Sequence, residues 1–303
     1  MMTTRRRFLT IAATAFALPG MARAGRIHTW QGVALGARAT IRIDHPDAAS
    51  IAEGVAVEIA RLEAIFSLYR EESALSRLNR DGVLRNPPFE LLECLSLVDA
   101  VHDATDGLFD PTIQPLWRAY ADAGAEGRRP DAAALRDLVS RTGWKRVGFD
   151  AGQVTLLPGM ALSLNGIAQG YIADRVAAML AGRGLGDILI DTGEFRALGG
   201  HPDGGGWPVR LAAGGTVPLA DRSLATSAPL GTTFDRDGMM GHILDPRSGL
   251  PSGARFREIT VTGHSAAIAD AVSTASCLMA SREDIETCLS KLPDLTLASI
   301  ATA

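Results

Sequence analysis

Apolar and polar residues alternate with two different periods along this chain, and the two periods predict strands and helices. Residues 39–43 (ATIRI) repeat at every second position, which is typical of a strand with one face in water. Residues 51–66 carry apolar side chains every three or four positions, which predicts an amphipathic helix, and the polar residues 67–73 predict a loop after it. The same stripe predicts a helix over residues 89–104, and Gly107 follows its expected end.

The second half of the chain is richer in predicted strands. A helix is expected over residues 171–180 and another from Ala266 onward, whereas the small and charged residues 121–131 predict a surface loop. The predicted strands of this half are residues 154–156, 161–164, 188–190, 209–211 and 259–261. Because helices and strands are interleaved without a regular β-α-β spacing, the pattern favours an α+β fold over a doubly wound parallel sheet.

Composition narrows the class of protein. The chain has 303 residues, of which 47% are hydrophobic, and this is typical of a globular protein with a substantial core. Its formal net charge of −4 argues against nucleic acid or anionic lipid as a partner. The three cysteines (Cys94, Cys277 and Cys288) form no CxxC pair, so neither a disulfide framework nor a thiolate zinc site is expected. No segment matches the glycine-rich motif of a dinucleotide-binding fold or of a P-loop.

The N-terminus has the pattern of an export signal. Three arginines at positions 5–7 precede a short apolar stretch, residues 11–18, and an Ala-Arg-Ala sequence at positions 22–24 fits a signal cleavage site. The order Arg-Arg-Arg-Phe-Leu fits the twin-arginine route, so we predict a signal peptide over residues 1–24 and a periplasmic mature domain over residues 25–303. The alternative is an uncleaved amphipathic helix. No other segment is long and apolar enough to span a membrane.

Asp270 and Thr274 form the sharpest candidate site. They are four positions apart in residues 268–275 (IADAVSTA), so on a helix they lie on the same face. A carboxylate and a hydroxyl on one face suit an oxygen-preferring cation such as Mg²⁺. The alternative is structural, with Asp270 as the N-terminal cap or an acid in the first turn of the helix and Thr274 in the core.

A glycine-bounded turn is a second candidate. In residues 162–171 (LSLNGIAQGY) a predicted strand runs through Gly166 and Gly170 into a helix. The first N–H groups of such a helix can receive a phosphate, and the carbonyls before it could complete a cation site. The alternative is a tight strand-to-helix connection that uses glycine for close packing.

His242 is a third candidate, because a neutral imidazole can accept a proton near pH 7. It is predicted to lie on a short strand before the turn that begins at Asp245, and the alternative is an ordinary histidine before a turn. Residues 67–79 and 105–112 each contain an aromatic residue that could stack on a flat ring.

In their order along the chain, these segments resemble the ApbE-like family, the FAD:protein FMN transferases. The resemblance extends from about residue 34 to residue 278, and its motifs are FSLYREESALSRLN, TDGLFDPT, GIAQGY followed by Asp174, LATS, HILDPRSGLP and IADAVSTA. It implies an α+β fold with mixed, largely antiparallel sheets and packed helices. It also implies a reaction in which FAD binds with Mg²⁺, FMN is transferred to a threonine or serine hydroxyl of a target protein, and AMP is released.

The resemblance also assigns roles to residues of this chain. Asp270, Thr274 and the backbone carbonyl of Gly166 correspond to metal ligands, with Ser273 close enough to contribute. His242 corresponds to the base or proton shuttle beside the acceptor hydroxyl. The positions that correspond to flavin or adenine contacts are Leu35, Tyr69, Leu108, Phe109, Asp110, Ser163, Gln169 and Leu244.

Three positions depart from the family pattern. Ser163 stands where aspartate is common, Gln169 where lysine is common, and Glu194 where aspartate is common. The first two differences remove a cofactor contact and a positive charge near the phosphates, so an altered affinity for FAD is expected. Glu194 is compatible with the family if the position only orders a turn.

The resemblance and the export signal together predict acceptors among periplasmic electron-transfer flavoproteins, such as the membrane flavoprotein that supports nitrous-oxide reduction or Rnf/Nqr-type subunits. The chain has no clear Ser/Thr-Gly-Ala-Ser/Thr acceptor site of its own, because residues 251–255 (PSGAR) end differently. Two other functions stay open: a Mg²⁺-dependent FAD pyrophosphatase that yields FMN and AMP, and a flavin-binding protein without turnover. Neither a nucleic acid partner nor stable insertion in a membrane is expected.

Overall fold

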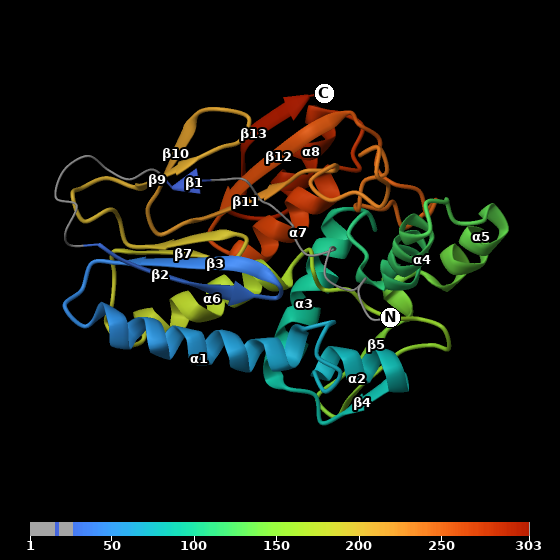
Figure 1. Ribbon diagram of the computed structural model, residues 1–303, viewed down its shortest axis with the longest axis horizontal. Coiled ribbons are helices and arrows are strands. Elements are labelled where there is room, and N and C mark those ends of the chain that lie inside the picture. Colours follow the sequence, from blue (N-terminus) through green and yellow to red (C-terminus); the bar gives the residue numbers. More distant parts are fainter. Residues whose placement is uncertain (1–15, 18–26, 303) are drawn as a thin grey trace.

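The computed structural model describes residues 16–17 and 27–302, whose largest element is a seven-stranded sheet. The sheet has the order β13-β12-β11-β8-β7-β3-β2, and all of its neighbouring strands are antiparallel (Figure 1). Its strands are β2 (His28–Ala34), β3 (Ala37–Ile43), β7 (Ile188–Asp191), β8 (Phe195–Leu198), β11 (Ser223–Ser227), β12 (Phe256–Gly263) and β13 (Thr296–Thr302).

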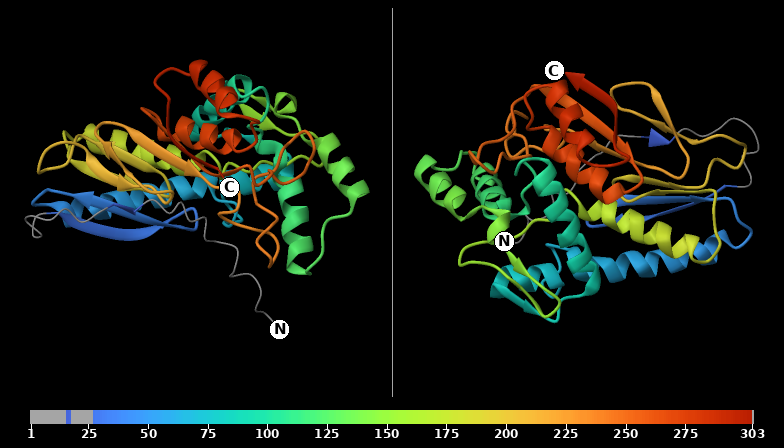
Figure 2. Two further views of the ribbon diagram at one scale, coloured as in Figure 1. Left: turned by 90° about the horizontal axis from the view of Figure 1, so that it is seen from above. Right: turned by 180° about the vertical axis from the view of Figure 1, so that it is seen from behind.

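Three helices cover one face of this sheet: α1 (Ala48–Phe66), α6 (Ala168–Ala181) and α7 (Ala266–Ser276). In the view from behind, these helices lie side by side on the sheet (Figure 2). The helix α1 contacts β2, α6 contacts β7 and β8, and α7 contacts β11 and β12. The largest apolar core lies between these helices and the sheet. The apolar stripe of α1 provides part of it, because its residues at spacings of three and four are buried.

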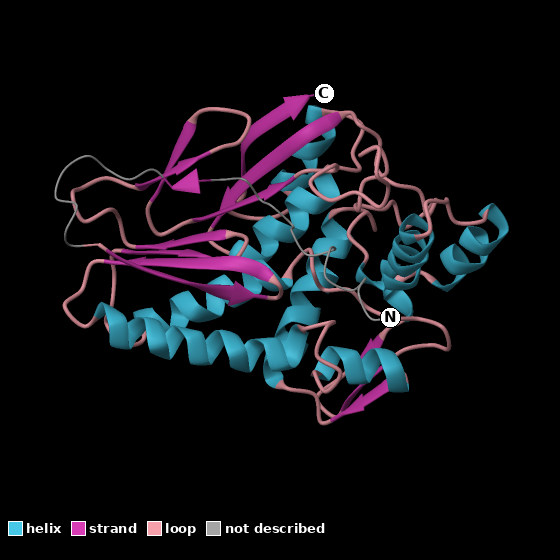
Figure 3. Ribbon diagram, viewed as in Figure 1, coloured by secondary structure: helices cyan, strands magenta, loops and turns pink. Residues whose placement is uncertain are grey.

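The opposite face of the sheet carries a smaller apolar cluster, which includes the fully buried Trp207. A three-stranded sheet contributes to it, formed by β1 (Phe16–Ala17), β9 (Trp207–Arg210) and β10 (Thr216–Leu219). A third sheet consists of β4 (Val83–Arg85), β5 (Gly148–Phe149) and β6 (Gln153–Thr155). The arrangement of helices and mostly antiparallel strands confirms the predicted α+β class (Figure 3).

The remaining helices surround one end of the sheet. The helix α3 packs against both α1 and α7, and α4 packs against α5. These elements are α2 (Ala74–Asp81), α3 (Phe89–Ala104), α4 (Gln114–Ala125), α5 (Ala132–Arg141), α8 (Arg282–Ser290) and the short 3₁₀ helices at Pro111–Ile113 and Trp144–Arg146.

Three local predictions are wrong. Residues 121–125 belong to α4, whose apolar side chains at positions 116, 120 and 123 are buried, so the predicted loop begins only at Glu126. Residues 161–164 are not a strand, because the backbone of Leu162 is hydrogen-bonded to the side-chain amide of Asn79 and not to a neighbouring strand. His242 lies in a loop between isolated β-bridges at Gly241 and Leu244.

The predicted helix over residues 89–104 is confirmed with its bounds. The three cysteines are buried free thiols. In residues 16–17 and 27–302, no helix is sufficiently long and apolar to cross a membrane. Apart from Phe16 and Ala17, the predicted signal peptide over residues 1–24 lies outside the described residues.

Candidate functional site

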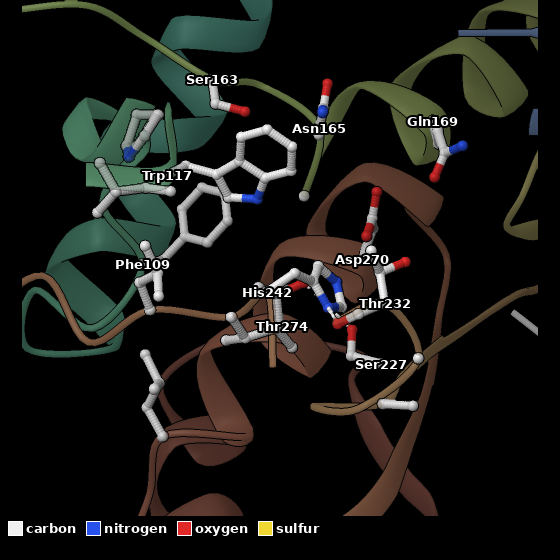
Figure 4. Close-up of a pocket in the computed structure, with 18 of the residues that line it drawn as sticks. Phe109, Trp117, Ser163, Asn165, Gln169, Ser227, Thr232, His242, Asp270 and Thr274 are labelled. Carbon is white, nitrogen blue, oxygen red and sulfur yellow. Dashed lines mark hydrogen bonds between the residues drawn. The ribbon is translucent and has the colours of Figure 1, made fainter. Parts of the chain in front are cut away.

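A pocket opens between α7, the turn before α6 and the loop of residues 228–255. It encloses about 1130 Å³ of space, a figure that includes the open solvent at its mouth. Eleven of the thirteen residues predicted for the site line it: Tyr69, Leu108, Phe109, Asp110, Ser163, Gly166, Gln169, His242, Leu244, Asp270 and Thr274. Figure 4 shows the polar groups of Asp270, His242 and Thr274 gathered on one side and the rings of Phe109 and Trp117 on another.

The helix α7 positions Asp270 and Thr274. Ser265 caps this helix, since its hydroxyl accepts a hydrogen bond from Ile268 N at 3.2 Å. Asp270 therefore lies in the middle of the helix, and the alternative in which it caps the helix is wrong. The predicted helical spacing is confirmed, because both side chains line the same pocket.

Asp174 of α6 holds the start of α7 in place. Its carboxylate accepts hydrogen bonds from Ala266 N at 2.9 Å, from Ala267 N at 3.1 Å and from the Ser265 hydroxyl at 2.8 Å. These bonds satisfy backbone donors that a helix start leaves without partners. Burial raises the pKa of Asp174 while these hydrogen bonds lower it, and burial is the larger effect.

Two glycines allow α6 to approach α7 closely. A Cβ on Gly170 would lie 2.2 Å from the carbonyl oxygen of Ala266, so a side chain there would force the helices apart. The Gly170 N–H instead donates a hydrogen bond to Asp270 Oδ2 at 3.3 Å. A Cβ on Gly166 would lie 3.3 Å from Thr274 Oγ1, which shows that the turn before α6 lies beside the Thr274 hydroxyl.

One side of the pocket holds two buried acids, Asp270 and Glu194, whose pKa values are raised. Asp270 is buried, and burial raises its pKa to about 8. Burial and the nearby charge of Asp270 also raise the pKa of Glu194 well above its ordinary value, although Glu194 accepts a hydrogen bond from Thr226 N at 3.1 Å. The pocket lining, as formed by the described residues, contains neither lysine nor arginine. Two buried acids without a cationic side chain beside them favour a bound cation.

The available donors fit a hard divalent cation. In the part of the chain that the structure describes, no group of three or more His, Cys, Asp or Glu residues is arranged to hold a metal. The set at the pocket is mixed: Asp270 brings a carboxylate and Thr274 a hydroxyl, and Gly166, which has no side chain, can bring only its backbone carbonyl. Mg²⁺ prefers oxygen ligands, and it commonly takes only one or two carboxylates while water and substrate phosphates complete its shell. These residues therefore fit Mg²⁺ better than Zn²⁺.

His242 lies on the loop side of the pocket. Its Nδ1 is 3.1 Å from the carbonyl oxygen of Thr232. Burial lowers the pKa of His242, and hydrogen bonds to the backbone of Thr232 and Pro229 only partly oppose this effect. The ring is therefore neutral near pH 7. A neutral imidazole has one N–H and one basic nitrogen, as a general base requires.

The aromatic side of the pocket includes a residue that the sequence interpretation missed. Trp117 of α4 lines the pocket with Phe109 (Figure 4). Tyr69 is 53% exposed at the pocket. Trp117 was missed because no helix was predicted over its segment. The spacing of the apolar residues Leu116, Tyr120 and Ala123 is a signal that could have predicted one. The lining also includes polar residues for which no ligand contact was predicted, among them Asn165, Glu194, Ser227 and Thr232.

Asp110 lines the pocket, but its carboxylate is used within the protein. One oxygen accepts hydrogen bonds from the backbone and hydroxyl of Thr112, and the other accepts from Trp144 N at 2.9 Å. Its carboxylate therefore holds the turn that positions Phe109. A ligand contact by Asp110 stays a prediction.

Two predicted site residues, Leu35 and Ser273, are not in the pocket lining. Leu35 occupies the turn between β2 and β3 with a φ of 48°, and its N–H donates to Glu63 Oε1 at 2.8 Å. Ser273 is fully buried, and its hydroxyl is bonded to Ser227 Oγ at 2.7 Å and to the carbonyl oxygen of Asp270 at 3.0 Å. The structure thus supports neither a direct FAD contact for Leu35 nor direct metal ligation by Ser273.

The fold and the site define the class of the protein: an α+β protein with buried acids, a neutral histidine and an aromatic wall in one pocket. The chain belongs to the ApbE family, whose family model matches residues 35–297. A FAD:protein FMN transferase of Klebsiella pneumoniae is 30% identical over 249 residues, which are 78% of this chain and 77% of the relative.

Solved structures share the fold. The apo form of the flavinyl transferase ApbE of Pseudomonas stutzeri matches with a TM-score of 0.79 and 25% identity, over 92% of this chain and 94% of that one. The ApbE protein of Thermotoga maritima matches with a TM-score of 0.80 and 24% identity, over 92% and 97% of the two chains. The seven-stranded sheet and its helical layer are therefore those of the ApbE fold.

Proposed function

We propose that this protein is a Mg²⁺-dependent FAD:protein FMN transferase that modifies a serine or threonine hydroxyl of a target flavoprotein. The name carried by the Klebsiella pneumoniae relative supports the activity. The observation that carries the proposal is the meeting of Asp270, Thr274 and Gly166 in a pocket whose described lining has no cationic side chain.

Charge balance supports the metal. The diphosphate of FAD is anionic, and the pocket lining formed by the described residues offers it carboxylates and neither lysine nor arginine. Asp270, Thr274 and the Gly166 carbonyl would hold Mg²⁺, which neutralises charge on the transferring phosphoryl group and on the leaving AMP. Gln169 is neutral, whereas the family often has lysine at this position. The bound metal would then supply the positive charge near the phosphates.

The remaining groups of the pocket support the transfer step. The basic nitrogen of His242 takes the proton from the acceptor hydroxyl, and the hydroxyl oxygen forms a bond to the phosphorus of the FMN half. The P–O bond of the diphosphate breaks, and AMP leaves with the electron pair of that bond. The aromatic rings of Phe109 and Trp117 offer a stacking surface for a flat ring system.

Incubation with FAD, MgCl₂ and a candidate acceptor domain tests the proposal. Covalent FMN on the acceptor together with AMP in equal amount supports transfer, and EDTA should prevent both. AMP release without labelling of any acceptor would instead identify a FAD pyrophosphatase. Stable FAD binding without AMP would identify a flavin-binding protein.

We also propose that the mature protein acts in the periplasm after export by the twin-arginine route, on electron-transfer flavoproteins such as the one that supports nitrous-oxide reduction or Rnf/Nqr-type subunits. The arginines at positions 5–7 and the apolar stretch after them support this proposal. Replacing Arg5 and Arg6 by lysine should leave the precursor in the cytoplasm. Mass spectrometry of periplasmic proteins, with and without this gene product, would identify the acceptor by its added FMN.

A further inference from the structure

Three hydroxyl groups form a connected cluster that runs from the pocket wall into the interior. Ser227, the last residue of β11, lies with its Oγ 2.7 Å from Ser273 Oγ and 3.1 Å from Thr274 Oγ1. The Ser273 hydroxyl also donates to the backbone carbonyl of Asp270 at 3.0 Å. Ser227 is 9% exposed and lines the pocket, whereas Ser273 is completely buried behind it. The cluster thus joins Thr274 to the interior of α7.

The end of the cluster determines the direction of its hydrogen bonds. A backbone carbonyl can only accept, so Ser273 uses its single proton on the Asp270 carbonyl. Ser273 must then accept from Ser227, and Ser227, having given its proton, must accept from Thr274. This order, Thr274 to Ser227 to Ser273 to the Asp270 carbonyl, uses all three protons. The reverse order leaves the Thr274 proton without a partner in the cluster.

The direction matters for Thr274. When its proton points to Ser227, both lone pairs of Oγ1 are free to face a cation beside the Gly166 turn. If Ser227 donated to Thr274 instead, one lone pair would be used and the Thr274 proton would be free to point at the cation. Groups behind a ligand commonly set its orientation in this way.

We propose that Ser227 and Ser273 are positioning residues that orient the Thr274 hydroxyl for metal binding, and that Ser273 is not itself a ligand. The inference rests on the metal site of the proposed function. It replaces the assignment of Ser273 as a direct ligand with an indirect role, and it gives a role to Ser227, which had none.

Manganese binding measures this role without reference to turnover. The free Mn²⁺ signal in electron paramagnetic resonance gives the dissociation constant of the full mature protein, with ADP present to supply a diphosphate. Ser227→Ala should weaken Mn²⁺ binding by about 10-fold, the low end of the effects of groups behind metal ligands. Ser273→Ala should also weaken it, because Ser227 can then donate to Thr274.

The double variant separates the two roles of Ser273. If Ser273 acts only through Ser227, Ser227→Ala with Ser273→Ala binds Mn²⁺ no more weakly than Ser227→Ala alone. If Ser273 were a direct ligand, Ser273→Ala would weaken Mn²⁺ binding by the same factor in the parent protein and in Ser227→Ala. That result would overturn the proposal. An unchanged dissociation constant in Ser227→Ala would overturn it as well.

A matched control lies one turn along on the same helix. Ser276 is also completely buried on α7, and its hydroxyl has no hydrogen-bond partner among the described residues. Ser276→Ala therefore removes the same atom from the same helix and should leave Mn²⁺ binding unchanged. Thermal unfolding of each variant without metal shows that it is folded.

Thr274→Val distinguishes failure of this inference from failure of the metal site itself. If Thr274→Val weakens Mn²⁺ binding but Ser227→Ala does not, the metal site stands and the positioning role is wrong. If Thr274→Val leaves Mn²⁺ binding unchanged, Thr274 is not a ligand. Both the metal assignment and the positioning role of Ser227 are then wrong.

Discussion

The two polar sides of the pocket are built in different ways. Asp270 and Thr274 belong to a regular helix, α7, which packs on the sheet and against the neighbouring helix α6. His242 belongs to the loop of residues 228–255, whose β-structure consists of isolated bridges and whose surface includes Met239, 68% exposed. The metal side is therefore expected to be rigid, whereas the histidine side can adjust to different acceptor proteins. Rigid placement suits the fixed diphosphate, and an adaptable loop suits the variable partner.

The largest expected effect concerns the rigid side. Asp270→Ala should abolish FMN transfer at any ordinary Mg²⁺ concentration, because it removes the carboxylate ligand. The metal-free variant should unfold at a temperature no lower than that of the parent, since a buried acid is removed and none is created. Full transfer activity in this variant would refute the metal assignment.

The next effect concerns the loop side. His242→Ala should slow transfer by about 10²–10⁴-fold, the usual contribution of a general base, while FAD binding survives. Rates with saturating FAD and flavin fluorescence titrations measure the two quantities separately. Unchanged transfer would remove the role of His242 as the base, and loss of FAD binding would show that the loop also holds the flavin.

A smaller effect tests how far the metal side depends on close helix packing. Gly170→Ala should lower the free energy of unfolding by about 1–3 kcal/mol, as overpacking commonly does, because the new methyl group meets the Ala266 carbonyl. It should also weaken Mg²⁺ binding, since the Gly170 N–H contacts Asp270. Gly186→Ala is the control, because nothing lies within 4 Å of a Cβ there. Equal stability of both variants in urea unfolding would contradict the packing argument.

A pH dependence is also expected for the metal side. The pKa of Asp270, raised from 3.8 to about 8, means that the folded protein keeps a proton that the unfolded chain releases. The unfolded state thus binds fewer protons between these values, so the metal-free protein should lose stability as the pH rises through that window. Mg²⁺ competes with the same proton, so its affinity should rise with pH and level off above about pH 8.

Metal titrations and thermal unfolding at several pH values check both trends, with Asp270→Asn as the control that should remove the contribution of this residue. Equal Mg²⁺ affinity at pH 6 and at pH 8 would show that Asp270 is not the titrating ligand.

The predictions made from the sequence were more accurate for the helices than for the loop that carries His242. The bounds of α3, the apolar stripe of α1 and the shared face of Asp270 and Thr274 were predicted from local spacing and are confirmed. The strand predicted around His242 was wrong, because that segment is held by isolated bridges to distant residues and not by a regular ladder. Trp117 was missed because small and charged residues at the end of α4 had the composition of a loop.

The family motifs reached residues that the local pattern did not, such as Leu108 and Leu244, but they did not separate ligands from the groups behind them. Ser273 is adjacent to Thr274 in sequence, yet the helix turns it away from the pocket and into the hydroxyl cluster. Glu194 was assigned only a role in ordering a turn, and its burial beside Asp270 became visible only in the folded chain.

The amino-acid sequence by itself determined which side chains share a face of α7, because a helix repeats every 3.6 residues whatever surrounds it. Only the tertiary structure decided what faces them, since Gly170 and Asp270 are 100 residues apart and meet through the packing of α6 on α7. Local geometry sets the direction of a side chain within its own element. The partner that it finds there depends on how distant elements bury their apolar faces together.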